Sequence, residues 1–154
     1  MIQLEKMNKL EFDEYLNFMI PDYAKEISTN YNLAMDKAME ESEVMMKDIF
    51  SEGLDTEGQF LYNIYDPVLK KKVGIIWFNV NREIDRAYIY HIFIEEAYRK
   101  QGYGTRALEE LQVKVKELGM NSLALSVFGS NKSAQSLYQK LGYVTSSISM
   151  HKLL

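Results

Sequence analysis

A glycine-containing segment in the second half of the chain, Arg99 to Thr105 (RKQGYGT), has the composition of a phosphate-binding turn. It follows an apolar run that ends at Ile94 and precedes an amphipathic run from Leu108 to Leu118. A turn that opens a helix leaves backbone N–H groups without partners, and the positive end of the helix dipole adds to their attraction for phosphate oxygens. Glycine allows close approach to the backbone. G-x-G alone is equally compatible with an ordinary strand-to-helix turn.

The spacing of these glycines differs from that of two common nucleotide-binding motifs. Ala107 stands where G-x-G-x-x-G requires a third glycine, and no G-x-x-x-x-G-K-[ST] segment is present. An enzyme that binds a mononucleotide through the same turn is one alternative. The acidic metal ligands expected beside a transferable phosphate are missing, however.

A second pair of residues, Asn131 and Tyr138, could contact one ligand. Positions seven apart lie on nearly the same face of a helix, and Ala134 falls between them on that face. Each has a plainer interpretation. Asn131 is a good helix N-cap, and Tyr138 shares helical core spacing with Leu141.

Three side chains in an aromatic run could move a proton: Tyr88, Tyr90 and His91. Strand alternation places Tyr88 and Tyr90 on one face and His91 on the other. His91 is the only internal histidine and titrates near neutrality, so it is a candidate base, although a lone histidine on a strand is more often structural. A water chain that ends on Tyr88, Tyr90 or a residue of the first helices is the alternative.

The surrounding sequence predicts the elements that position these residues. From Leu10 to Phe50 the apolar spacing of three and four indicates helices, with a break at Pro21. After these helices, the sequence shows three strand patterns in a row and then alternates between helix and strand patterns. Strands are expected at 59–65, 72–80, 86–94 and 122–127, helices at 102–118 and 132–141, and a last extended segment at 143–153. Antiparallel strands followed by alternating strands and helices predict an α/β fold with a mixed sheet flanked by helices.

The composition narrows the class of protein. The 154 residues fit one domain, 1–154, and the formal net charge of -4 argues against nucleic acid as a partner. The absence of cysteine excludes disulfides and a cysteine acyl-enzyme, and suits a cytoplasmic location. No metal site is expected. The start of the chain lacks the apolar core of a signal peptide, and no stretch reaches the roughly 18 apolar residues of a membrane span.

Two motifs resemble those of a known superfamily. Arg99-x-x-Gly102-x-Gly104 is similar to the [QR]-x-x-G-x-[GA] signature of the GNAT (Gcn5-related N-acetyltransferase) superfamily. The segment from Asn131 to Tyr143 resembles its N-x-x-A-x-x-x-Y-x-x-x-G-[FY] motif. Within this superfamily, the chain resembles small bacterial acetyltransferases. The resemblance implies a mostly antiparallel central sheet with one parallel pair at a cofactor cleft.

The resemblance also implies a role for each motif residue. The cofactor would be acetyl-CoA, its pantetheine arm pairing with the backbone of Ile92, Phe93 and Ile94. Tyr138 would protonate the leaving thiolate, and Asn131 and Ala134 would lie beside the pantetheine. The pyrophosphate would be held by the amides of Arg99, Lys100, Gln101, Gly102, Tyr103, Gly104 and Thr105. Several superfamily members carry a carboxylate base at the position of Ser126, and that role does not transfer to serine.

The expected reaction is direct acetyl transfer to an amine of a small molecule or peptide, by a monomer or homodimer. The alternative is an acyl-CoA-binding module with little or no catalysis, which the missing carboxylate at Ser126 leaves open. Competition by ATP but not by CoA would instead support the mononucleotide enzyme.

Overall fold

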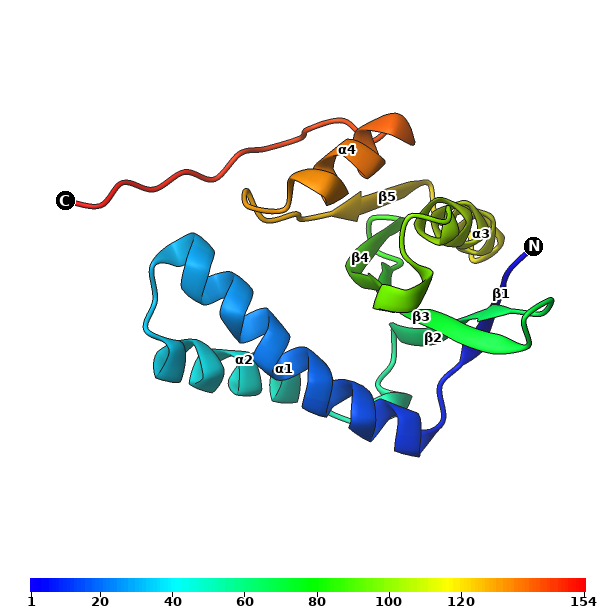
Figure 1. Ribbon diagram of the computed structural model, residues 1–154, viewed down its shortest axis with the longest axis horizontal. Helices are drawn as coiled ribbons and strands as arrows, with labels where there is room; N and C mark the ends of the chain where they lie inside the picture. Colours follow the sequence, from blue (N-terminus) through cyan, green and yellow to red (C-terminus); the bar gives the residue numbers. More distant parts are fainter. The chain divides into compact units, whose positions relative to one another are not determined.

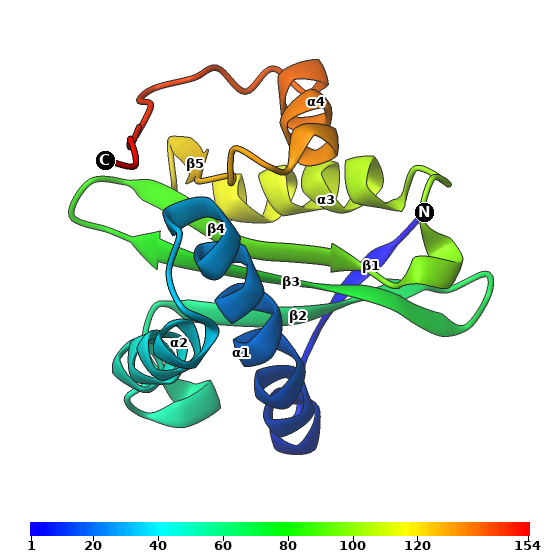
Figure 2. The same cartoon turned by 60° about the vertical axis from the view of Figure 1, so that its left-hand side comes forward.

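The fold is a five-stranded mixed sheet flanked by helices, in a computed structural model that describes all 154 residues. The strands are β1 (Gln3–Lys6), β2 (Gln59–Asp66), β3 (Lys71–Asn81), β4 (Arg86–Ile94) and β5 (Ser122–Leu125), in that order across the sheet. The first three pairings are antiparallel, whereas β4 and β5 are parallel. Figure 2 shows β2, β3 and β4 side by side. The predicted fold class is confirmed.

Contacts divide the chain into two compact units. Residues 1–15 and 49–126 form one unit, here called the sheet unit, and residues 16–48 and 127–154 form the other, the helical unit. The long helix α1 (Lys9–Tyr31) begins in the sheet unit and continues in the helical unit. No helix combines the length and the apolar character that crossing a membrane requires.

The core of the sheet unit is built from continuous buried runs in the two central strands β2 and β3. Trp77 and Phe78 of β3 are 1% and 0% exposed. Helix α3 (Tyr103–Glu117) buries Ala107 and Leu111 at helical spacing and packs against the sheet. Phe50 bridges the start of α1 to the sheet, because its ring lies 5.1 Å from Phe12 and 4.9 Å from Trp77. Two short 3-10 turns, Gly53–Asp55 and Glu96–Tyr98, complete this unit.

The helical unit contains most of α1, α2 (Met35–Ile49) and α4 (Lys132–Lys140), and Figure 1 shows the short connection between α1 and α2. The predicted break at Pro21 is wrong, since α1 runs through it to Tyr31. A proline removes one hydrogen bond, which a long helix tolerates. The helix ends at Tyr31, and the next residue, Asn32, is left-handed (φ 51°), as is common after a helix. The hydroxyl of Ser28 donates to the carbonyl of Leu33 at 2.6 Å and closes that end.

Two short segments differ from the sequence-based expectation. β1 was not anticipated, because four residues are too few to show a period and two of them are charged. The extended segment at 143–153 belongs to no strand. Its apolar side chains Val144, Ile148 and Met150 are 88%, 76% and 88% exposed. Strand stability depends on burying side chains against neighbours, and this segment buries none after Tyr143.

Candidate active site

The predicted phosphate turn is the N-terminus of α3. Gly102 is the N-cap residue and is left-handed, with φ 81°, and no side chain caps the helix start. A Cβ on Gly102 would meet only Arg106 Nε, at 4.0 Å, so the glycine serves the backbone conformation and an uncovered surface rather than tight packing. Arg106 donates to the carbonyls of Gln101 (3.0 Å) and Gly102 (3.3 Å). The turn therefore presents exposed backbone donors beside one bound guanidinium.

This turn is tied to the β2–β3 hairpin by Tyr103, the first residue of α3. Its hydroxyl donates to the carboxylate of Asp66, which also accepts from the amides of Val68 (2.8 Å) and Leu69 (3.1 Å). The bond from Tyr103, followed by that from Leu69, lowers the pKa of Asp66 below its usual range, and the same bond to Asp66 raises the pKa of Tyr103. The sequence does not predict this link, because a side-chain contact across 37 residues leaves no local pattern.

Part of β4 has a free edge. β5 pairs with β4 only from Arg86 to Ile89, so the stretch from Tyr90 to Ile94 has a partner strand, β3, on one side only. Such an edge can accept an extended ligand as an additional strand. At its far end, Arg99 Nε donates to the carbonyl of Ile94 at 2.8 Å, and the guanidinium lies 5.2 Å from the ring centre of Phe93. The free edge coincides with the predicted segment Ile92–Phe93–Ile94.

A β-bulge lies at the start of this free edge. Trp77 of β3 faces His91, but the next residue, Phe78, faces Ile89, so Tyr90 is the extra residue of β4. Residues directly opposite each other share a face of the sheet, and Tyr90 also stacks on Trp77 at 4.3 Å. His91 and Tyr90 therefore lie on the same face. The prediction that His91 lies on the opposite face is wrong, because an inserted residue shifts the alternation by one.

The aromatic side chains of this face are held by specific contacts. His91 Nδ1 is hydrogen-bonded to the hydroxyl of Tyr15, on α1, at 2.8 Å. The hydroxyl of Tyr88 donates to Ser126 Oγ at 2.6 Å. The rings of Tyr88 and Tyr90 meet edge to face at 5.0 Å. Burial, and then the neighbouring Tyr88, raise the pKa of Tyr90, which keeps its phenol protonated at neutral pH.

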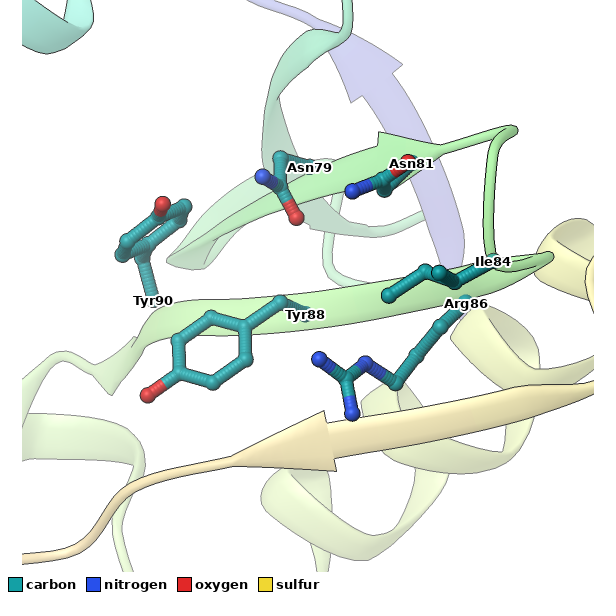
Figure 3. A pocket seen from close by; sticks show the side chains of 6 residues that line it. All are labelled: Asn79, Asn81, Ile84, Arg86, Tyr88 and Tyr90. Carbon is teal, nitrogen blue, oxygen red and sulfur yellow. The ribbon is translucent and has the colours of Figure 1, made fainter.

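A cavity of about 350 Å³ opens at the start of β4, within the sheet unit. Figure 3 shows its side chains: β3 contributes two asparagines, and β4 contributes an arginine and two tyrosines. The full lining is Asn79, Asn81, Ile84, Arg86, Tyr88 and Tyr90. Only the two tyrosines were predicted from the sequence, because asparagine and arginine near a hairpin are typical of ordinary turns.

The remaining predicted residues lie in the helical unit, on or next to α4. Asn131 is the N-cap of this helix, and its Oδ1 accepts from the amide of Ala134 at 3.2 Å. The plainer interpretation of Asn131 is therefore correct, whether or not it also binds a ligand. Tyr138 is 9% exposed, and its ring lies 5.5 Å from Tyr143. Burial, with a smaller effect of Tyr143, raises the pKa of Tyr138 to about 12.

Comparison with known proteins agrees with this architecture. The sequence model of the acetyltransferase (GNAT) family matches residues 22–143. The uncharacterized N-acetyltransferase YdgE of Bacillus subtilis is 31% identical over 98% of this chain and 97% of its own. The crystal structure of YycN from the same organism is 29% identical, with a TM-score of 0.95 over 100% of this chain and 99% of that one. A shorter match, 34% identical over 42% of this chain and 44% of the relative, is to the ribosomal protein bS18-alanine N-acetyltransferase of Escherichia coli. The chain thus belongs to the GNAT family and is an acetyltransferase.

Proposed function

We propose that this enzyme takes its acetyl group from acetyl-CoA and passes it directly to an amine of a small molecule or peptide. The observation that carries the proposal is the coincidence of two backbone features in the sheet unit. The edge of β4 is free from Tyr90 onward, and the same chain segment leads into an α3 N-terminus that no side chain caps. An extended, phosphate-bearing ligand suits the two together.

The proposed roles of the chain follow from this placement. The backbone of Ile92, Phe93 and Ile94 pairs with the pantetheine, and the amides from Arg99 to Thr105 hold the pyrophosphate. When bound, acetyl-CoA supplies a thioester: the amine nitrogen forms a bond to the acetyl carbon, the C–S bond breaks, and the coenzyme leaves as a thiol. A backbone donor at the Tyr90 bulge polarises the carbonyl oxygen.

The helical unit supplies the proton in this proposal. A phenol whose pKa is raised to about 12 stays protonated at neutral pH, so Tyr138 can donate to the departing sulfur. Asn131 and Ala134 contact the pantetheine region. These three assignments rest on the family motif, and Asn131 keeps its capping bond in any case.

The acceptor amine must lose a proton, and three side chains on the bulged face are candidates to receive it. The imidazole of His91 can accept a proton at neutral pH without first ionising, unlike the phenols of Tyr88 and Tyr90. We therefore assign His91 as the base, held by Tyr15, with Tyr88 and Tyr90 lining the approach. Because the chain has no cysteine, transfer within a ternary complex is favoured over a cysteine acyl-enzyme.

We also propose the domain organisation, cellular location and oligomeric state of the enzyme. The family match draws on residues of both units, which supports treating 1–154 as a single domain. The lack of cysteine suits the reducing cytoplasm, and the protein would act as a monomer or homodimer.

A thiol-release assay with a panel of amines tests the proposal. Wild-type protein should release free coenzyme only when an amine is present, and mass spectrometry should find the acetylated amine. His91→Ala should lower kcat by about 100-fold or more and leave acetyl-CoA affinity unchanged, as expected for loss of a general base. Lack of turnover with every amine would contradict the proposal, and full activity of His91→Ala would remove the base assignment alone.

A further inference from the structure

The side chains that line the cavity at the start of β4 include one cationic group and no anionic group. Arg86 is the charged residue among its lining side chains, and the guanidinium forms no ion pair and no hydrogen bond within the chain. Asn81 lies directly opposite Arg86 on β3. An exposed guanidinium beside an amide, in a concave site, is suited to a carboxylate or phosphate.

Asn79, which also lines the cavity, requires a hydrogen-bond donor from a ligand, whereas Arg86 requires an acceptor. Its Oδ1 is buried and has no hydrogen-bond partner. A buried acceptor without a donor is costly, and native proteins usually satisfy such atoms. Because Asn79 lies opposite Tyr88, this acceptor stands between Arg86 and the Tyr90 bulge. A ligand that fits both positions has an anionic end followed by an N–H donor.

The length of the site sets the size of that ligand. Strand residues rise by about 3.3 Å each, so Arg86 and Tyr90 are separated by roughly 13 Å along β4. The side chain of Arg86 covers part of this span. Two or three peptide residues, at about 3.5 Å each, cover the remainder. An α-amino acid, whose amine and carboxylate share one carbon, is too short to reach both ends.

We propose that the acceptor is a short peptide of two or three residues with a free amino end and a free carboxylate. The carboxylate binds Arg86, a main-chain N–H donates to Asn79 Oδ1, and the amino group lies at the Tyr90 bulge. This inference rests on the proposed function, because it places the reacting amine where β4 becomes free to bind the coenzyme.

Matched acceptors test each contact separately. Diglycine and triglycine would be compared with their C-terminal amides, which lack the charge. 5-Aminopentanoate has the chain length of diglycine but lacks its internal N–H. Aminoalkyl phosphates distinguish a phosphate-bearing acceptor from a peptide carboxylate. Each compound would be measured by thiol release and, independently of catalysis, by calorimetric titration in the presence of CoA.

Three variants complete the experiment. Arg86→Gln should weaken diglycine by about 10-fold or more, in KM and in Kd, with little change for its amide. Asn79→Leu should weaken diglycine but not 5-aminopentanoate, and should leave stability unchanged or raised because it removes an unpaired buried oxygen. Arg82→Gln is the matched control, since Arg82 is on the same hairpin but outside the cavity lining; it should behave as wild type.

The outcomes separate the two proposals. If no amine is acetylated but diglycine binds in an Arg86-dependent way, the peptide site stands and the proposed reaction fails. If amines are acetylated with no preference for acid over amide, or Arg86→Gln affects both equally, the peptide site is wrong and the reaction stands. Tighter binding of aminoalkyl phosphates than of any peptide would also overturn the peptide assignment.

Discussion

The hydroxyl of Tyr88 donates to Ser126 Oγ across 2.6 Å and joins β4 to the residue that follows β5. The resemblance to the GNAT superfamily placed a carboxylate base of several members at the position of Ser126. Here that position carries a neutral hydroxyl that accepts a hydrogen bond from Tyr88, and a serine hydroxyl without a basic partner is a poor base. The base that we propose, His91, lies elsewhere on this face of the sheet.

Replacing Ser126 should accordingly have little effect on catalysis. Ser126→Ala removes one hydrogen bond, worth about 1 kcal/mol of stability, and should change kcat by less than about threefold. Tyr88→Phe removes the same bond from the other side, so the double variant should lose no more stability than the larger single effect. Thermal unfolding and steady-state kinetics measure both. A loss of several orders of magnitude in kcat for Ser126→Ala would restore serine as the base.

Gly102→Val should abolish coenzyme binding. The left-handed backbone at this position disfavours a β-branched residue by about 1–2 kcal/mol, and the added side chain lies on the surface that a phosphate approaches. Gly119→Val is the matched control: Gly119 follows α3, is also left-handed (φ 86°), and has nothing within 4 Å of its added Cβ. Both variants should lose similar stability, but only Gly102→Val should lose acetyl-CoA affinity. If the two variants bind acetyl-CoA with equal affinity, the proposed phosphate site at Gly102 is wrong.

Tyr138→Phe should lower kcat by about 10-fold or more with little change in coenzyme Kd, because it removes a proton donor and keeps the ring. The raised pKa of about 12 predicts that ionisation of this phenol does not limit turnover between pH 6 and 10. Tyr143→Phe, which removes the neighbouring hydroxyl, should retain activity. Wild-type kcat in Tyr138→Phe would mean that solvent or another group protonates the thiolate.

Tyr103→Phe should remove a contribution to stability that wild type loses only at acidic pH. The bond from Tyr103 lowers the pKa of Asp66 below its ordinary value of 3.8. A lowered carboxyl pKa stabilises the fold above the ordinary value, and this contribution is lost as the pH falls through the lowered one. The difference in unfolding midpoint between wild type and Tyr103→Phe should therefore be complete at pH 7 and shrink below about pH 4.

The phosphate turn should also loosen in Tyr103→Phe, so acetyl-CoA affinity should fall a few-fold. Tyr98→Phe, in which the hydroxyl of an adjacent tyrosine is removed, is the control. A stability difference that stays constant from pH 7 to pH 3 would show that the bond to Asp66 contributes no charge-dependent stability.

Sequence patterns predicted most strands and the α3 helix of the sheet unit. β3 and β4 were found because β-branched and aromatic runs are local signals, and the turn at Gly102 was found because its spacing is local too. The resemblance implied a bulged strand, but the residues did not show where the bulge lies, since one inserted residue is defined only by the partner strand. That single residue reversed the face assigned to His91. The cavity chemistry of Arg86 and Asn79 was missed for the same reason, because the two lie on different strands.

The central claim is that the free edge of β4 and the start of α3 bind acetyl-CoA. Calorimetric titration of the purified protein with acetyl-CoA, CoA and ATP in parallel tests it most directly. The structure predicts micromolar or tighter binding of acetyl-CoA, slightly weaker binding of CoA, no binding of ATP, and loss of both coenzymes in Gly102→Val. Binding of ATP alone, or of neither coenzyme, would contradict the claim and reduce the turn at Gly102 to a structural feature.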